Sequence, residues 1–296
     1  MSPQSRRIGI TLGDSAGIGP EIVEAALASS LLPKGFEFVV IGEELEGIAG
    51  KPSEMSATAA RNALEESVAM ALKGDLCAVV TAPVSKHSLH KIGFDFPGQT
   101  EFFATRCNVQ DYAMLLTGGG LTVALITAHL PIKDAIAALS SGEIERVGNL
   151  LADFLLLRKS NPGIAVAGLN PHAGEQGDLG SEESEIIEPA IKKLQTRWGD
   201  KVSFSGPFPP DTIFMRAVAG EFDAVLCMYH DQGLIPLKLH AFDQGVNVTL
   251  GLPFIRTSPD HGTAFDIAGK GMARPDSMIA AIRLAAELSE ARMKSA

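Results

Sequence analysis

Three histidines follow three short apolar runs of the sequence. His129 follows LTVALITA, His172 follows IAVAGLNP, and His230 follows FDAVLCMY. Runs of this kind are typical of parallel strands covered on both faces, and ligands bind at the carboxyl ends of such strands. Imidazole binds divalent metals and transfers protons near neutral pH. The positions are compatible with a shared metal site but do not establish one, because the wide separations match no local metal motif. Loop histidines that cap helices or pair with carboxylates are the alternative.

A second set of residues suits an anionic ligand. Lys238, Asn247 and Arg256 recur at equal intervals through LIPLKLHAFDQGVNVTLGLPFIR. Arginine forks to phosphate or carboxylate, and lysine acts as a point charge. Taken singly, each of them is also explained as a solvated surface residue.

The loop PDHGTAFDIAGKG, near the end of the chain, combines glycines with polar groups. Gly262 permits close backbone approach, Thr263 offers a hydroxyl, and Asp266 offers a carboxylate to a sugar. It is no dinucleotide fingerprint of the GxGxxG type, and GIG at residues 17–19 lacks the third glycine. A plain loop before the helix SMIAAIRLAAELSE is the simpler interpretation.

The elements that must position these residues alternate between strands and helices. Residues 54–73 have helical periodicity and stop at Gly74, and residues 143–158 form a second amphipathic pattern. Ser140 and Glu143 are spaced as a capping box for that helix, and Asp211 is placed to cap the helix before the last strand. The alternation predicts an α/β fold.

The amino-acid composition limits the classes of molecule that the chain is expected to bind. The chain has 296 residues, 46% of them hydrophobic, and a formal net charge of -10. Scattered basic residues give no footprint for nucleic acid or an anionic membrane, no run is long enough to span a bilayer, and Arg6-Arg7 precedes no export core. Cys77, Cys107 and Cys227 form no CxxC pair, which suits the cytoplasm. We expect a small-molecule partner.

Seven motifs, in order along residues 8 to about 275, resemble the 4-hydroxythreonine-4-phosphate dehydrogenase family: AGIGPE, PGQTEFF, TAHLP, GLNPHAGE, PPDTIF, MYHDQGLIPLK and GVNVTLGLPFIRTSPDHGTA. The resemblance implies that His129, His172 and His230 bind a divalent cation (zinc, magnesium, cobalt or manganese) in a homodimer with its active site at the interface. It also implies a phosphorylated or carboxylate substrate, with these contacts: Gln99, Thr100, Asp211, Lys238, Asn247 and Arg256.

The segment GDSAGIGPE and the loop HGTAFDIAGKG are also similar to isopropylmalate and isocitrate dehydrogenases. That similarity implies two α/β/α domains flanking a cleft, which we place at residues 1–98 plus 262–296 and at residues 99–261. It implies NAD bound by His261, Gly262, Thr263 and Asp266, whose carboxylate disfavours the added phosphate of NADP. Arg274 stands where those enzymes usually have asparagine, which softens this discrimination.

The implied reaction is NAD- and metal-dependent oxidation, with decarboxylation, of 4-phosphooxy-L-threonine in pyridoxine biosynthesis. The bound metal would lower the pKa of the substrate hydroxyl, with Lys238 or Asp231 as candidate catalytic base. Two departures from the family pattern fit a paralogue: Gln99 replaces the usual histidine, and the chain is short between residues 45 and 60. Such a paralogue would oxidise 4-phospho-D-threonate, an erythronate or a cyclic dihydrodiol carboxylate. A non-catalytic metabolite-binding protein and an acyl or phosphoryl transferase are the remoter alternatives.

Overall fold

The chain divides into two α/β units, each described separately below. The computed structural model of the protein describes residues 5–42 and 48–295. Unit 1 comprises Met1–Gln110 with Val246–Ala296, and unit 2 comprises Asp111–Gly245. These limits differ from the domain boundaries predicted from the sequence, which stay a prediction. The sequence predicts that the chain is shorter than its family between residues 45 and 60. Part of that region, residues 45–47, lies outside the described residues.

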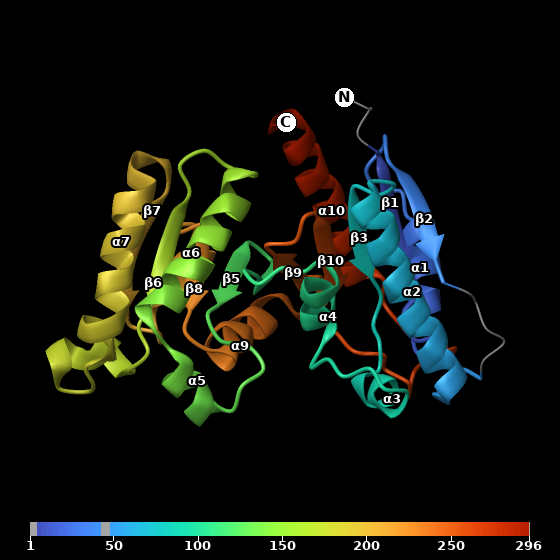
Figure 1. Ribbon diagram of the computed structural model, residues 1–296, viewed down its shortest axis with the longest axis horizontal. Coiled ribbons are helices and arrows are strands. Elements are labelled where there is room, and N and C mark those ends of the chain that lie inside the picture. The colour runs from blue at the N-terminus through green and yellow to red at the C-terminus, as the bar shows by residue number, and fades with distance from the viewer. Residues whose placement is uncertain (1–4, 43–47, 296) are drawn as a thin grey trace. The chain divides into compact units, whose positions relative to one another are not determined.

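Unit 1 is a sheet with helices on both faces. Its strands lie in the order β2 (Glu37–Ile41), β1 (Arg7–Thr11), β3 (Ala78–Thr81), β10 (Ile255–Pro259), β9 (Val246–Leu250). Only the ladder between β9 and β10 is antiparallel among those of this described sheet. One face carries α2 (Glu54–Lys73), α3 (Lys86–Lys91) and α4 (Gln99–Arg106), and the other carries α1 (Gly19–Leu27) and α10 (Asp276–Ser295) (Figure 1).

Unit 2 repeats this layered plan. Its strands lie in the order β4 (Ala113–Gly118), β5 (Leu121–Leu125), β8 (Ala224–Cys227), β6 (Gly163–Ala167), β7 (Ser203–Phe208). Parallel ladders join the last four, and β4 runs antiparallel to β5. Helices α8 (Ile213–Val218) and α9 (His230–Ala241) pack on one face, and α6 (Ser141–Leu156) and α7 (Glu188–Trp198) lie together on the other (Figure 1). Helix α5 (Ile132–Ala138) follows the β5 loop, and four short helical segments complete the unit: Pro171–Gly177, Glu183–Ile187, Gly199–Lys201 and Phe242–Gln244.

Burial explains why the central strands read as unbroken apolar runs. Every residue of β3, β5 and β8 is buried, because helices cover both faces of each sheet. The outer strands β2 and β7 are partly exposed. The α/β fold predicted from the sequence is confirmed.

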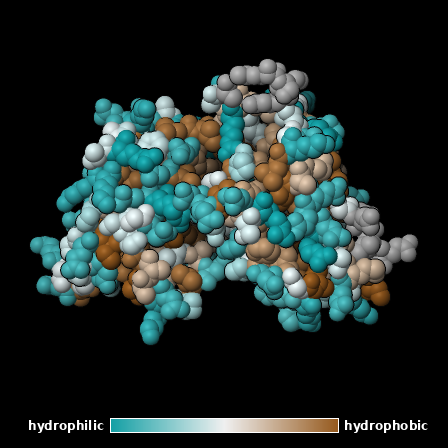
Figure 2. Space-filling model, in the orientation of Figure 1, coloured by the Kyte–Doolittle hydropathy of each residue, from teal (hydrophilic) through white to brown (hydrophobic). Residues whose placement is uncertain are grey.

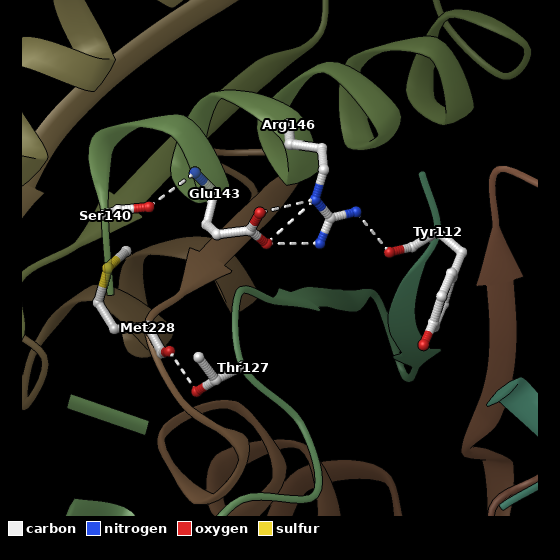
Figure 3. Close-up of polar contacts among 6 residues, drawn as sticks. All are labelled: Tyr112, Thr127, Ser140, Glu143, Arg146 and Met228. Atoms are coloured by element: carbon white, nitrogen blue, oxygen red, sulfur yellow. Dashed lines mark hydrogen bonds and ion pairs between the residues drawn. The ribbon is translucent and has the colours of Figure 1, made fainter. Parts of the chain in front are cut away.

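Helix ends test the local predictions. Helix α2 has the predicted limits and ends at Gly74, whose φ of 84° is left-handed. Helix α6 begins two residues earlier than predicted, at Ser141. The Ser140 hydroxyl accepts from the Glu143 amide at 3.2 Å, but the Glu143 carboxylate pairs with Arg146 instead of closing a capping box (Figure 3). The cap predicted from Asp211 was wrong, since no side chain caps α8.

Figure 2 shows hydrophilic residues over much of the visible face with hydrophobic patches between them. None of the described helices is long and apolar enough to cross a membrane. The three cysteines are free thiols, and burial raises the pKa of each. They therefore stay protonated and pack as small apolar side chains.

Candidate active site

The three histidine-bearing loops leave neighbouring strands of unit 2. Strands β5, β8 and β6 lie side by side and run parallel, so their carboxyl ends share one edge of the sheet. His129 follows β5, His230 begins α9 directly after β8, and His172 lies in the loop after β6. The fold thus brings together three loops that are far apart in the sequence.

His129 and His230 lie next to each other in the lining of one pocket. Their ring centroids are 5.9 Å apart, with the rings tilted by 42°. The pocket has a volume of about 550 Å³, and Asp231 and the apolar side chains of Leu130 and Ile132 also line it. Two imidazoles at the mouth of a partly apolar pocket suit a metal or a polar ligand.

Asp231 orients the ring of His230. Its Oδ1 lies 2.7 Å from Nδ1 of His230, so the carboxylate accepts a hydrogen bond from the Nδ1–H. That bond fixes the tautomer and leaves Nε2 of His230 as the nitrogen with a lone pair, as in metal sites where a carboxylate supports a histidine ligand. Asp231 was predicted from the sequence as a candidate base. Its hydrogen bond to His230 also lets it orient that ring.

His172 opens a left-handed turn. The five residues from His172 to Gln176 have φ values of 54°, 54°, 81°, 43° and 59°, and only Gly174 among them is glycine. Each non-glycine residue in this region costs about 1–3 kcal/mol, so the surrounding structure must hold the turn. The strain places an exposed imidazole at the strand end, which a relaxed loop would not fix there.

The three histidines do not form a complete metal site in this one chain. Within residues 5–42 and 48–295, no three His, Cys, Asp or Glu side chains are close enough together to hold an ion. His129 and His230 supply a neighbouring pair, and His172 lies outside that pair. A cation shared between two subunits, as the sequence resemblance implies, needs only part of its ligands from each chain.

Unit 1 contributes a buried guanidinium. Arg256, on β10, is 2% exposed, and its three hydrogen bonds go to neutral side-chain oxygens of Thr81 at 2.6 Å, Gln99 at 2.9 Å and Thr249 at 3.2 Å. Its Nε is buried and has no hydrogen-bond partner within residues 5–42 and 48–295. Burial lowers the pKa of Arg256 to about 9, against which the charge of Glu101 acts. A buried cation that is only partly satisfied favours an anion as ligand.

Other predicted substrate contacts surround Arg256. Gln99 and Thr100 form the first turn of α4, and the Thr100 hydroxyl lies 3.5 Å from that of Thr249. Asn247 lies on β9, next to β10, and its Oδ1 is buried without a hydrogen-bond partner. Unit 1 therefore gathers amide, hydroxyl and guanidinium groups at one place.

Two further predicted contacts belong to unit 2. Lys238 is exposed on α9, and Asp211 is exposed just before α8. Sequence reasoning missed Thr81 and Thr249, which supply hydroxyls to Arg256. Thr81 is the last residue of β3, so it lies at the carboxyl end of a strand as the histidines do, whereas nothing in the sequence marks Thr249.

The loop predicted to hold a cofactor packs on the N-terminal glycine segment. The Ile18 amide donates to the Thr263 carbonyl at 2.9 Å, and a Cβ on Gly17 would lie 2.7 Å from that oxygen. Gly262 has open space beside it, Thr263 is buried, and the Asp266 side chain is exposed. His261 keeps its Nδ1 near the Gly262 carbonyl at 3.1 Å. An exposed carboxylate beside an open glycine fits the ribose of a nucleotide.

The fold and these two residue sets define an α/β dehydrogenase. A family model described as "Pyridoxal phosphate biosynthetic protein PdxA" matches residues 23–285. The chain belongs to this family, and it is a dehydrogenase acting on a CH–OH group.

Named relatives support the assignment along nearly the whole chain. A 4-hydroxythreonine-4-phosphate dehydrogenase of Bradyrhizobium diazoefficiens is 43% identical, covering 99% of this chain and 86% of the relative. A D-threonate 4-phosphate dehydrogenase of Salmonella typhimurium is 40% identical, covering 97% and 100%. The chain is therefore similar to enzymes with two different named substrates.

Solved structures agree with both the family and the fold. A 4-hydroxythreonine-4-phosphate dehydrogenase of Klebsiella pneumoniae has a TM-score of 0.80 at 36% identity, covering 96% of this chain and 100% of that one. A terephthalate 1,2-cis-dihydrodiol dehydrogenase of Burkholderia xenovorans reaches 0.68 at 28%, covering 95% and 97%. An isocitrate dehydrogenase of Methylococcus capsulatus, 18% identical with a TM-score of 0.54 over 97% and 87%, shares the fold.

Proposed function

We propose that this chain catalyses the NAD- and divalent-metal-dependent oxidation of 4-phosphooxy-L-threonine, followed by decarboxylation, in the synthesis of pyridoxal phosphate. Arg256 carries the choice of a phosphorylated substrate. Its buried guanidinium donates to the neutral oxygens of Thr81, Gln99 and Thr249, and its Nε has no hydrogen-bond partner among the residues that the structure describes. A phosphate dianion offsets the burial of that charge better than a neutral group does.

The remaining substrate contacts follow from the chemistry of the side chains. Thr100 and Asn247 offer a hydroxyl and an amide, Lys238 offers an amino group, and Asp211 accepts from a substrate hydroxyl or amine. The Oε1 of Gln99 already accepts a hydrogen bond from Arg256, so its Nε2–H₂ group is the part that we assign to a ligand. These assignments rest on the family resemblance and on the polar groups gathered beside Arg256.

His129, His172 and His230 are the proposed metal ligands. The neighbouring rings of His129 and His230, and the carboxylate of Asp231 behind His230, fit this role. Zinc, magnesium, cobalt and manganese are the candidate ions, and such an ion supplies Lewis acidity toward the substrate hydroxyl and toward the oxygen that becomes negative as carbon dioxide leaves.

The chain's own groups perform the proton and cofactor steps. Oxidation moves a hydride from the carbinol carbon to the nicotinamide and a proton from the hydroxyl to a base. Lys238 is the stronger candidate for that base, because Asp231 is engaged by His230. His261, Gly262, Thr263 and Asp266 are the proposed NAD contacts. The exposed carboxylate of Asp266 suits the ribose hydroxyls and repels the 2′-phosphate of NADP.

A homodimer in the cytoplasm is the proposed state. Helix α9 and the residue after it expose three large apolar side chains at helical spacing: Ile235 is 65% exposed, Leu239 88% and Phe242 69%. An apolar stripe of this kind is typical of a surface covered by another chain. A dimer also accounts for a metal site that is incomplete in one subunit.

Gln99 favours a second candidate, a paralogue that oxidises D-threonate 4-phosphate or an erythronate. Glutamine stays neutral at every pH, whereas the histidine usual in the family can carry charge. Phosphate recognition in this chain therefore depends more on Arg256. A cyclic dihydrodiol carboxylate, the third candidate, lacks the phosphate that Arg256 suits.

The deciding experiment measures NADH formation with added divalent metal on these substrates side by side. We expect phosphorylated substrates to be oxidised and Arg256→Lys to lose about 10- to 100-fold in kcat/KM on them, because lysine cannot fork. Gln99→His serves as the matched probe of preference between the L-threonine and D-threonate compounds. Absence of turnover on every substrate, with NAD still bound, would favour the metabolite-binding alternative. Turnover only of the dihydrodiol carboxylate would overturn the phosphate assignment.

A further inference from the structure

A buried glutamine joins two of the histidine-bearing loops. Gln232 is 6% exposed, its Oε1 accepts from the Met228 amide at 2.7 Å, and its Nε2 donates to the Gly168 carbonyl at 2.7 Å. Met228 follows β8 and leads to His230, while Gly168 follows β6 and leads to His172. One amide group therefore links the carboxyl ends of β8 and β6, because it supplies without charge both the acceptor and the donor that these two backbone groups need.

The third loop is tied to the same backbone. The Thr127 hydroxyl donates to the Met228 carbonyl at 2.9 Å, and the Thr127 amide lies 3.3 Å from that oxygen (Figure 3). Thr127 comes directly before the turn that carries His129. The peptide groups of Met228 are thus held on one side by Thr127 and on the other by Gln232.

A buried carboxylate holds the start of the His172 loop. Glu183 is 4% exposed, and its Oε1 accepts from the amides of Leu169 and Asn170 at 2.8 Å each. Its Oε2 accepts from the Asn170 side-chain amide at 2.9 Å. These bonds fix the two residues that precede Pro171 and His172, where the backbone turns left-handed.

The fit around Glu183 leaves no room for other side chains. A Cβ on Gly174 would lie 2.7 Å from Oε2, and one on Gly168 would lie 3.1 Å from Oε1. Gly174 is the middle residue of the left-handed turn, so the carboxylate packs against both the beginning and the centre of that turn. The glycines and Glu183 therefore act as one arrangement.

We propose that Gln232 and Glu183 are positioning residues that set the spacing of the three histidines and the direction of the His172 ring. The inference rests on the proposed metal site. Neither side chain is a metal ligand in it. Each acts through the backbone of a loop that carries one, which is how outer groups tune a metal centre.

The test uses the metal-free full-length protein titrated with Co²⁺, read by visible absorption and by calorimetry. Glu183→Gln keeps the shape but replaces one acceptor oxygen with a donor that faces the Asn170 amide. Gln232→Met keeps the length and removes both bonds. Gln195→Met is the matched control, since Gln195 donates to the Phe204 carbonyl elsewhere in unit 2.

We expect wild type and Gln195→Met to bind Co²⁺ alike. Glu183→Gln and Gln232→Met should bind about 10- to 100-fold more weakly, with an altered d–d spectrum and unchanged affinity for NAD. The proposal would be overturned if the Glu183→Gln protein melts cooperatively and binds Co²⁺ with the affinity and spectrum of wild type. If Gln232→Met does not fold, the result for Glu183→Gln alone decides the test. His230→Ala separates the two hypotheses: if it binds Co²⁺ as wild type does, the metal assignment itself is wrong, and the positioning roles fall with it.

Discussion

At the scale of single residues, Arg256, which we propose as a substrate contact, shows the stability cost of burying a cation. Burial lowers its pKa to about 9, which means that the folded state disfavours the charged form. When folding lowers the pKa of a base, the folded protein binds fewer protons than the unfolded chain at every pH between the lowered pKa and the ordinary one. The cost is therefore fully present at neutral pH and is relieved as pH rises through 9. A bound anion relieves it without a change of pH.

Inorganic phosphate should stabilise the protein through Arg256. At pH 7 with EDTA, phosphate at about ten times its Kd adds about 1.4 kcal/mol, or about 2–4 °C in Tm. Thermal melting measures the Tm, and the control is sodium chloride at the same ionic strength as the phosphate. Arg256→Met should lose the shift and Arg6→Met, at an exposed position, should keep it. The shift should shrink above pH 9, and an equal shift in Arg256→Met would contradict the assignment.

At the scale of elements, the sequence predicted those helices and strands whose residue pattern is set by periodicity and burial. Helix α2 was located by its helical periodicity, and the central strands β5, β6 and β8 were located because helices on both faces of a sheet demand unbroken apolar runs. The antiparallel pair β9 and β10 was not located, since its polar residues Asn247 and Arg256 interrupt the pattern. Where polar side chains lie inside a strand, the apolar pattern no longer marks it.

The site was predictable to a similar extent. Strand ends located His129, His172 and His230, but the left-handed turn at His172 was not predicted because four of its five residues are not glycine. Long-range contacts hold that conformation, and Glu183 carries no local signal for it. The hydroxyls that Thr81 and Thr249 offer to Arg256 depend on pairing between distant strands, which one sequence does not specify.

Helix ends give a paired stability prediction. Gly74→Ala places a side chain at φ 84° with nothing within 4 Å, so only backbone strain opposes it, and we expect a loss of about 1 kcal/mol. Gly142→Ala, inside α6 with its nearest contact at 4.0 Å, should add a few tenths of a kcal/mol. Denaturant unfolding measures both, and a loss of the same size at each glycine would refute the left-handed cap as the cause.

At the scale of the whole molecule, the apolar stripe on α9 makes the proposed dimer testable. Leu239→Asp introduces a charge at an 88% exposed position, and we expect it to convert dimers to monomers in light scattering and to weaken Co²⁺ binding. Leu72→Asp, on α2 at 52% exposure, is the control that should stay dimeric. A monomeric wild type, or a dimeric Leu239→Asp, would count against the stripe as the interface.

The order of the units along the chain also affects how the protein is made. Strand β3 is synthesised early, yet its neighbour β10 and the covering helix α10 lie near the end of the chain. Unit 2, by contrast, is one uninterrupted stretch, Asp111–Gly245. On the ribosome the later unit therefore has all its strands first, while β1 to β3 wait with an open edge and an uncovered apolar face. Of the nascent segments, that N-terminal one has the greatest need of a chaperone.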